Sequence, residues 1–305
     1  MTRVRIGSRG SALALAQATW VQQRLVGYHP GLEIDICVVK TSGDRFLDRP
    51  IANIGGKGVF TKEIEEELLA KHIDIAVHSM KDLPTEVAQG LAIAAVPQRE
   101  DARDVLVTRD RRALGELAAG TRVGTGSLRR RAQLLNQRND LEVMPIRGNV
   151  DTRLKKLDDG EVDALIMAAA GLKRIGRTER IGEYLSDTVC VSAVAQGALA
   201  IEARDDDVST RELLAFLHDA NSFAEVSAER ALLARLGGGC QVPIGARARV
   251  SDNRLMITGV VASPDGAGLC RAELSGPARE AVLLGHRLAE ELVRQGAKQW
   301  ISMAE

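Results

Sequence analysis

Residues 74–82 indicate the fold class more directly than any other part of the chain, and their sequence is Asp74-Ile75-Ala76-Val77-His78-Ser79-Met80-Lys81-Asp82. The run over 74–78, whose central residues 75–77 are apolar, is typical of a short strand buried on both faces. An amphipathic helix is expected before it, over 61–72, and polar side chains follow it directly. This order is typical of a mostly parallel α/β sheet, in which ligands bind at the carboxyl ends of the strands.

The same alternation of strand and helix extends on both sides of this segment. Upstream, strands are expected at 4–7 and 32–40, with a helix between them that Ser11 caps and Gly27 ends. Downstream, a second unit is expected from about residue 101, with strands at 104–108, 122–124, 142–145 and 164–168 and helices at 128–137 and 151–157. A chain of 305 residues has room for two or three domains.

The pattern changes from residue 209 onward. Ser209–Glu212 and Ser222–Glu225 both match the capping box, so each is expected to open a helix. Beyond the three glycines at 237–239, alternating segments predict strands at 244–250, 254–262 and 268–274, followed by an amphipathic helix from Pro277 to Gly296. These elements predict an α+β unit with an antiparallel sheet.

Composition excludes several classes of protein. The 41 basic residues balance the 41 acidic ones, and aromatic residues are only 3%, which argues against a nucleic-acid binder. No apolar run is long enough to cross a membrane and the N-terminus has no apolar leader pattern, so we expect a cytoplasmic protein without membrane contact. The four cysteines form no CxxC pair and the five histidines no spaced pair, so no metal site is expected.

Two glycine-rich sequences resemble nucleotide-binding loops without matching them. Residues 55–58 have Ile51 in place of the leading glycine of a phosphate loop and Gly58 where Ser or Thr is required. Residues 124–129 begin like a dinucleotide fingerprint but have Arg129 in place of the third glycine.

Basic residues instead gather at three successive strand ends. After the strand at 122–124 comes a turn with two hydroxyl groups and a helix whose first turn holds three arginines, an unfavourable place for cations. Because a helix N-terminus offers free N–H groups to anions, this arrangement favours an anion site over a solvated surface. Residues 121–181 carry 13 Arg and Lys against 8 Asp and Glu. The residues expected to line one crevice are Thr125, Ser127, Arg129, Arg130, Arg147, Gly148, Asn149, Arg153, Lys173 and Arg174.

Two further side chains have both an ordinary and a functional interpretation. Asp82 beside Lys81 is either a helix cap or surface ion pair, or a carboxylate that stabilises a developing cation or moves protons. Cys240 follows three glycines and is expected to be more exposed than Cys37, Cys190 and Cys270, either as a plain thiol or as a functional one. Spacing alone leaves both questions open.

Six motifs together resemble the porphobilinogen deaminase (hydroxymethylbilane synthase) family. They are GSRGSALAL at 7–15, GGKG at 55–58, AVHSMKDLP at 76–84, SLRR at 127–130, RGNV at 147–150 and GGCQVPIG at 238–245. They occur in order, and the resemblance runs from about residue 3 to residue 300. Several are six or more residues long and independent of one another, so chance similarity is negligible.

The resemblance implies a three-domain architecture. Two periplasmic-binding-protein-like α/β domains would flank a cleft, with a smaller C-terminal α+β domain that has a three-stranded antiparallel sheet. Domain 1 would comprise residues 1–98 and 198–217, with the catalytic aspartate and a mobile lid. Domain 2 would be the arginine-rich segment 99–197, and domain 3 the segment 218–305 with the attachment cysteine. A monomer is implied.

The resemblance also implies a reaction. The enzyme would deaminate four porphobilinogen molecules and join them head to tail onto a dipyrromethane cofactor, which a thioether attaches to Cys240. Water would release the linear tetrapyrrole hydroxymethylbilane, the substrate of uroporphyrinogen-III synthase. Asp82 matches the family's catalytic aspartate, which stabilises the cationic azafulvene left when ammonia departs.

Each pyrrole brings an acetate and a propionate, so a growing chain needs many fixed cations, for which arginine is suited. The positions that match cofactor contacts are Ser79, Lys81, Asp82, Thr125, Ser127, Arg129, Arg130, Arg147, Gly148 and Asn149. Those that match substrate contacts are Arg9, Ser11, Arg147, Arg153, Arg174 and Gln196, while Lys57 and Phe60 lie in the sequence that resembles the lid.

Three positions depart from the family pattern. Gly126 replaces a serine, while Ala195 and Ala200 stand where glycine is usual, which questions the backbone there because alanine scarcely adopts a positive φ. The alternative to an enzyme is a non-enzymatic soluble anion-binding or regulatory module of the same two-lobed architecture. It accounts for the arginines, but not for Asp82 beside Lys81 or for Cys240 in a third domain.

Overall fold

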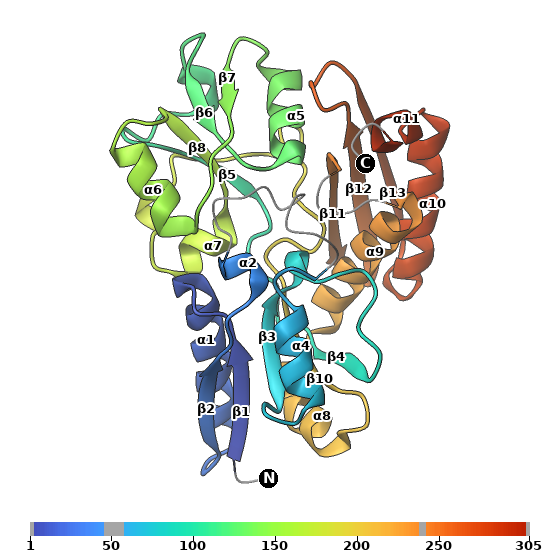
Figure 1. Cartoon of the computed structure of the whole chain (residues 1–305). Helices are drawn as coiled ribbons and strands as arrows, with labels where there is room; N and C mark the ends of the chain where they lie inside the picture. Colours follow the sequence, from blue (N-terminus) through green and yellow to red (C-terminus); the bar gives the residue numbers. More distant parts are fainter. Residues whose placement is uncertain (1–2, 46–57, 238–241, 303–305) are drawn as a thin grey trace. The chain divides into compact units, whose positions relative to one another are not determined.

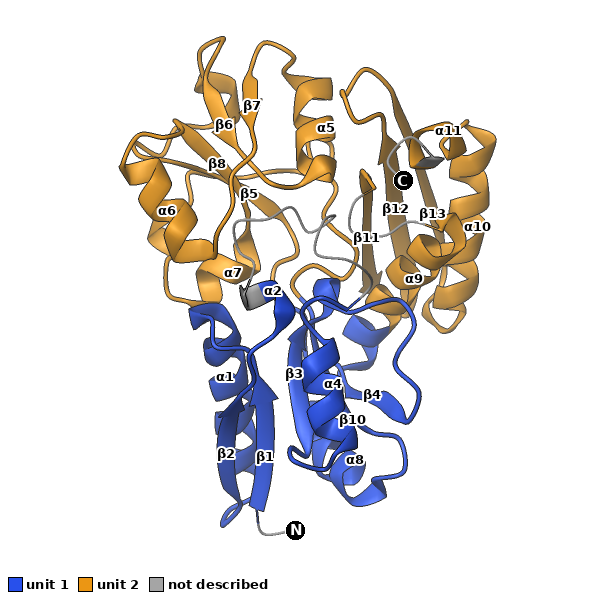
Figure 2. Ribbon diagram, viewed as in Figure 1, with its two compact units in different colours: residues 1–99, 198–223 blue, residues 100–197, 224–305 orange. Residues whose placement is uncertain are grey.

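The computed structural model describes residues 3–45, 58–237 and 242–302. The chain divides into two compact units, which Figure 2 distinguishes by colour. Unit 1 comprises Met1–Arg99 and Ala198–Phe223, and unit 2 comprises Glu100–Gly197 and Ala224–Glu305. No described helix has the length and apolar character needed to span a membrane.

Unit 1 is built on a five-stranded sheet with the order β2-β1-β3-β10-β4 (Figure 1). Its strands are β1 (Arg3–Ser8), β2 (Glu33–Val38), β3 (Ile75–Ser79), β4 (Leu91–Ala95) and β10 (Leu199–Arg204). Strand β1 runs parallel to β2 and β3, whereas β10 runs antiparallel to β3 and β4. The helices of this unit are α1 (Ala12–Tyr28), α2 (Ser42–Arg45), α4 (Lys62–Leu69) and α8 (Val208–Leu214).

The two faces of the unit 1 sheet bury different side chains. Residues of α1 such as Val21 and Leu25 pack with Ile75 and Val77 of β3 on one face. On the other face, Ile64 and Leu68 of α4 pack with Ala76 of β3. Strand β3 is therefore buried on both sides, as the run over 74–78 predicts.

Unit 2 contains a second five-stranded sheet with the order β7-β6-β8-β5-β9. Its strands are β5 (Asp104–Thr108), β6 (Arg122–Gly124), β7 (Glu142–Met144), β8 (Ala164–Ala168) and β9 (Glu183–Tyr184), and its helices are α5 (Leu128–Gln137), α6 (Val150–Asp158) and α7 (Ala169–Arg174). Strand β6 is parallel to β7 and β8, and β5 is antiparallel to β8 and β9.

The two sheets follow one plan, and each has a single antiparallel strand in the fourth position. In both units this strand is the first that the chain forms after it passes from one unit to the other. Such a strand needs no helical crossover from a neighbour in its own sheet, so it is free to run antiparallel. The prediction of mostly parallel α/β units is confirmed.

The C-terminal segment forms a three-stranded antiparallel sheet of β11 (Ile244–Ser251), β12 (Arg254–Ala262) and β13 (Leu269–Pro277). Figure 1 shows α10 (Ala281–Arg294) lying along β12 and β13. Helices α9 (Ala220–Leu236) and α11 (Lys298–Ser302) complete this part of the chain. The predicted C-terminal α+β unit is confirmed.

Both helices predicted from the capping boxes are present, but the predicted capping residues are wrong, because an aspartate upstream of each serine caps the helix instead. Helix α8 begins at Val208, and the Asp207 carboxylate accepts a hydrogen bond from Thr210 N at 3.0 Å. Helix α9 begins at Ala220, and Asp219 Oδ1 accepts from Ser222 N at 2.8 Å. Short 3₁₀ turns complete the elements at Met80–Asp82, Leu114–Glu116, Thr178–Arg180, Ala215–Leu217 and Ala278–Glu280.

Candidate functional site

Three predicted site residues follow the carboxyl end of β3 in unit 1. The Ser79 hydroxyl lies 2.9 Å from Nε2 of the buried Gln17 in α1, which fixes the end of the strand against the helix. The chain then makes the 3₁₀ turn Met80–Asp82, and Met80 N donates a hydrogen bond at 3.0 Å to the carbonyl oxygen of Ala198, the residue before β10. Gln17 gave no local signal in the sequence, because it lies 62 residues from Ser79.

Asp82 occupies the last position of this turn and is half-buried. It caps no helix, and within the described residues it has no hydrogen-bond or ion-pair partner, Lys81 included. Neither of the ordinary roles considered for it is therefore present. The geometry leaves a carboxylate at a strand end with its oxygens available.

The residues after β1 form a second small cluster in unit 1. Ser11 is the N-cap of α1, as predicted, and its hydroxyl accepts from Ala14 N at 3.3 Å. The Arg9 guanidinium stacks 4.1 Å from the centre of the Phe60 ring, a cation–π contact. The structure thus brings together a predicted substrate arginine and a predicted lid residue. Lys57 lies outside the described residues.

In unit 2, the turn after β6 leads directly into α5. Thr125 is buried, and its hydroxyl accepts from Ser127 N at 3.2 Å. Ser127 caps α5 by accepting from Arg130 N at 3.4 Å. A Cβ at Gly126 would lie 2.8 Å from the Ile146 carbonyl oxygen, so the backbone here has no room for the serine that the family usually carries.

Arg129 and Arg130 are buried and share one carboxylate that sequence reasoning missed. Arg129 Nη1 lies 2.6 Å from Asp104 Oδ2, and Arg130 Nη2 lies 2.7 Å from Asp104 Oδ1. Asp104 on β5 is fully buried; burial opposes its ionisation, but the two guanidinium charges outweigh burial and lower its pKa. Two cations and one anion leave this cluster with an excess positive charge.

Gln196 and Cys190 complete the surroundings of Asp104. Gln196 donates from Nε2 to Ala102 O at 2.7 Å and to Asp104 Oδ1 at 2.9 Å. Arg130 Nη2 lies 3.4 Å from Gln196 Oε1. Burial and the neighbouring Asp104 charge raise the pKa of the Cys190 thiol to about 12, so it is a protonated donor to that carboxylate. Cys190 is thus a core residue, as predicted.

Arg153 and Arg174 are half-buried and bind neutral carbonyl groups. Arg153 Nε donates to Gly148 O at 2.8 Å, and Arg174 Nη2 donates to Gly197 O at 2.7 Å. Burial lowers the pKa of each guanidinium to about 10. The charges of Arg130 and Arg147 lower it further for Arg153, which places these three predicted arginines within electrostatic reach of one another. In the described part of the chain, neither Arg153 nor Arg174 forms an ion pair with a carboxylate, although the Glu100 carboxylate is near enough to Arg174 to raise its pKa and so oppose the effect of burial.

Gly148 and Asn149 have clear backbone roles. Gly148 has φ +112°, and a Cβ there would lie 2.6 Å from Thr152 Cγ2, so only glycine fits. Asn149 caps α6 by accepting from Thr152 N at 2.9 Å. Together they turn the chain so that Arg147 and Arg153 follow the end of β7 closely.

These positions suit a group that carries several carboxylates. Half-buried guanidiniums without carboxylate partners are costly until an anion neutralises them. The region of unit 2 at the ends of β6, β7 and β8 holds two such cations, Arg153 and Arg174, and a buried cluster with a net positive charge. Among the residues that the structure describes, no group of three His, Cys, Asp or Glu side chains could hold a metal ion.

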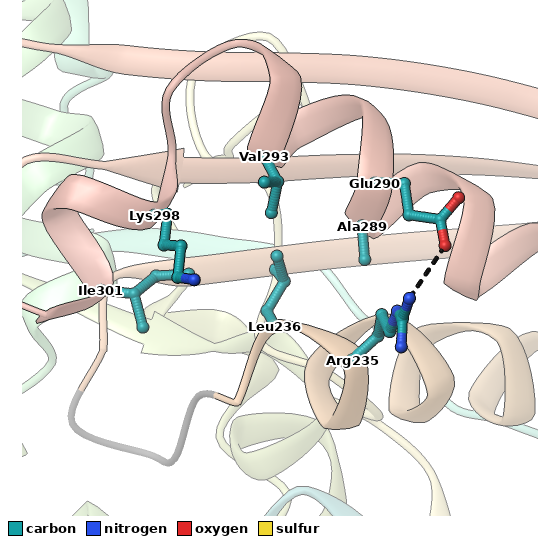
Figure 3. A pocket seen from close by; sticks show the side chains of 7 residues that line it. All are labelled: Arg235, Leu236, Ala289, Glu290, Val293, Lys298 and Ile301. Carbon is teal, nitrogen blue, oxygen red and sulfur yellow. Dashed lines mark hydrogen bonds and ion pairs between the residues drawn. The ribbon is translucent and has the colours of Figure 1, made fainter.

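Figure 3 shows a separate pocket of about 300 Å³ in unit 2, lined by α9, α10 and α11. The exposed ion pair between Arg235 and Glu290, 3.2 Å apart, borders it. None of the predicted site residues lines this pocket.

The fold and the arginine-rich strand ends are those of an α/β protein whose cations suit a multiply charged anion. Residues 4–212 match the family model "Porphobilinogen deaminase, dipyromethane cofactor binding domain", and residues 223–294 match "Porphobilinogen deaminase, C-terminal domain". The chain belongs to the porphobilinogen deaminase family, as its motifs indicate.

Full-length relatives agree with this assignment. The porphobilinogen deaminase of Syntrophotalea carbinolica is 51% identical over 96% of this chain and 93% of its own length. That of Desulforudis audaxviator is 52% identical over 96% of this chain and 94% of its own. Among solved structures, the methionine-binding protein MetQ aligns with a TM-score of 0.44 and 12% identity, over 77% of this chain and 94% of that one.

The predictions of an enzyme and of its cofactor are therefore confirmed. The protein is a transferase of tetrapyrrole biosynthesis that acts on porphobilinogen, and its cofactor is dipyrromethane. The non-enzymatic alternative is not favoured. Cys240, the predicted attachment residue, lies outside the described residues.

Proposed function

We propose that this protein condenses four porphobilinogen molecules head to tail, with loss of one ammonia each, onto a dipyrromethane attached to Cys240, and then releases hydroxymethylbilane by hydrolysis. The observation that carries the proposal is the set of half-buried arginines without carboxylate partners at the strand ends of unit 2. A chain of pyrroles with two carboxylates per ring would neutralise them.

The arginines have distinct parts in this proposal. Arg153 and Arg174 would bind carboxylates directly, because their present partners are neutral carbonyls that an anion can replace. Arg129 and Arg130 would contribute through the excess positive charge that they retain beside Asp104. When bound, the cofactor supplies the pyrrole carbon to which the first substrate unit is joined.

Asp82 would serve as the catalytic carboxylate. Loss of ammonia from porphobilinogen leaves positive charge on the substrate, and a carboxylate held nearby stabilises that charge. Asp82 is suited to this role because it is half-buried at the end of β3 and its oxygens have no partner among the described residues. Asp82 belongs to a turn that is hydrogen-bonded to Ala198, the residue before β10, and this bond restricts where its charge lies.

Four further statements belong to the proposal. The chain would form three domains, at 1–98 with 198–217, at 99–197 and at 218–305, an idea that the presence of three separate sheets supports. It would act as a monomer and pass its product to uroporphyrinogen-III synthase. It would work in the cytoplasm, where the three described cysteines, all free thiols, would stay reduced.

The test is Asp82→Asn, with Asp206→Asn as the control, since Asp206 is an exposed carboxylate of the same unit. We expect Asp82→Asn to keep the cofactor, seen by intact mass, while hydroxymethylbilane formation falls by about 10²–10⁴-fold. The control should keep its rate. A near-normal rate for Asp82→Asn would remove it from the catalytic role, and a wild-type protein that forms no hydroxymethylbilane would contradict the proposed reaction.

A further inference from the structure

Ala195 has a backbone conformation that alanine rarely adopts. Its φ is +58°, in the left-handed region, and the residue is buried. This is one of the two positions at which the sequence has alanine where the family usually has glycine. The other, Ala200, lies in strand β10 without a positive φ. The departure at 195 therefore has a real conformational cost, which disfavours the left-handed form by about tenfold or more.

A buried carboxylate holds Ala195 in this conformation. Glu229, on α9, is fully buried, and its Oε2 accepts a hydrogen bond from Ala195 N at 2.6 Å. Its Oε1 accepts from Ala248 N on β11 at 2.7 Å. All three residues belong to unit 2. Hydrogen bonds from backbone N–H groups to a carboxylate are among the stronger ones in proteins.

The turn over 194–197, which contains Ala195, provides partners for two of the site arginines. Gln196, the next residue, holds Asp104 and contacts Arg130 through its amide. The carbonyl oxygen of Gly197 accepts from Arg174 Nη2 at 2.7 Å. A Cβ at Gly197 would lie 2.3 Å from Glu100 O, so this turn is closely fitted and has little freedom to adjust.

We propose that Glu229 is a positioning residue for substrate binding: its carboxylate compensates for alanine at 195 and so places Gln196 and Gly197 where they orient Arg130 and Arg174. The inference rests on the proposed function insofar as those arginines bind pyrrole carboxylates. It adds Glu229, which lies outside the six motifs, to the residues that shape the site. It also predicts that the protein depends on Glu229 because residue 195 is alanine.

The chemistry of the carboxylate explains why glutamine should not replace it. A carboxylate offers one acceptor oxygen to each of the two N–H groups, at 2.6 and 2.7 Å. An amide offers one acceptor oxygen and one NH₂ group, so one of the two backbone N–H groups would face a donor. Glycine at 195 would remove the conformational cost without removing its N–H group.

The experiment compares the wild type, Glu229→Gln, Ala195→Gly and the double variant. The control is Glu225→Gln: Glu225, one turn earlier on α9, accepts a hydrogen bond from Val250 N on β11 at 3.0 Å, a residue outside the 195–197 turn. Two readouts are taken. One is hydrogen–deuterium exchange of the peptide that contains 195–197, and the other is KM and kcat for porphobilinogen.

We expect Glu229→Gln to speed exchange of the 195–197 peptide and to raise KM by about tenfold with a smaller change in kcat. Ala195→Gly should reverse most of both effects in the double variant, whereas Glu225→Gln should change neither. The inference fails if Ala195→Gly gives no rescue, or if Glu225→Gln and Glu229→Gln behave alike. Because exchange is measured without turnover, it decides the inference even if the wild type forms no hydroxymethylbilane, an outcome that contradicts only the proposed function.

Discussion

Asp104→Asn tests whether the buried carboxylate on β5 offsets the free-energy cost of burying Arg129 and Arg130 in unit 2. Asp104 accepts from Arg129 Nη1 at 2.6 Å, from Arg130 Nη2 at 2.7 Å and from Arg130 Nε at 3.0 Å, and it is fully buried. Asparagine has nearly the same shape but no charge, so two buried guanidiniums would lose their counter-ion.

Removal of one partner from a buried ion pair costs about 3–5 kcal/mol of unfolding free energy. This is a large part of the total for a typical protein, which is about 5–15 kcal/mol. The matched control is Asp163→Asn. Asp163 pairs with Arg122 at 2.8 Å in the same unit, but both side chains remain more than a third exposed, so the expected loss is about 0–1 kcal/mol.

The two tryptophans allow unit 2 to be followed separately in the assay. Trp20 lies in α1 of unit 1 and Trp300 in α11 of unit 2, so a Trp20→Phe background leaves one fluorophore in unit 2. Urea unfolding of each variant in this background gives the loss of stability. A loss below about 1 kcal/mol for Asp104→Asn, equal to that of the control, would refute the view that this carboxylate compensates the arginine pair.

Two further predictions concern charge. Arg153→Met should weaken porphobilinogen binding, measured by calorimetry, about tenfold, as expected for loss of a hydrogen bond to a charged group. It should not lower the melting temperature, because a guanidinium whose pKa burial has lowered to about 10 is not stabilised by its present surroundings. Arg131→Met, at an exposed arginine, should change neither quantity, and equal effects of the two substitutions would contradict the assignment of Arg153. Burial opposes ionisation of Asp101, but contacts with Arg103 outweigh burial and lower the pKa of Asp101 from 3.8 to about 2. Between about pH 4 and pH 2 the unfolded chain therefore binds more protons at this residue than the folded chain does. The stability of the wild type should therefore fall as the pH is lowered from about 4 to about 2, and that of Asp101→Asn should fall less steeply. Identical pH profiles of the melting temperature for the two proteins would contradict this prediction.

Local patterns predicted most of the fold. The predicted bounds of β5, β6, β8, α5 and β12 match the structure. They could be predicted because apolar periodicity and helix caps depend only on residues that are neighbours in the sequence. The capping boxes failed because an aspartate two or three residues upstream competes for the same N–H groups.

The structure places the predicted site residues in hydrogen bonds and ion pairs that the sequence did not predict. Ser127 and Asn149 were expected to contact anions, and in the structure both cap helices, whereas Ser11 was predicted to cap its helix and does so. Anion contact and helix capping both need a small polar residue where a strand passes into a helix. The role of Asp104 could not be predicted from the sequence, because its partner arginines lie 25 and 26 residues away. A charged residue at the start of an apolar strand is also compatible with several structural roles. Glu229 was equally invisible, because it meets Ala195 only through the tertiary fold.

The most direct test of the central claim is the intact mass of the denatured protein, wild type beside Cys240→Ser, produced in cells that make porphobilinogen. The account predicts that the wild type exceeds its sequence mass by two deaminated pyrrole units and that Cys240→Ser does not. An unmodified wild type that remains unmodified after incubation with porphobilinogen, or the same added mass on Cys240→Ser, would contradict it.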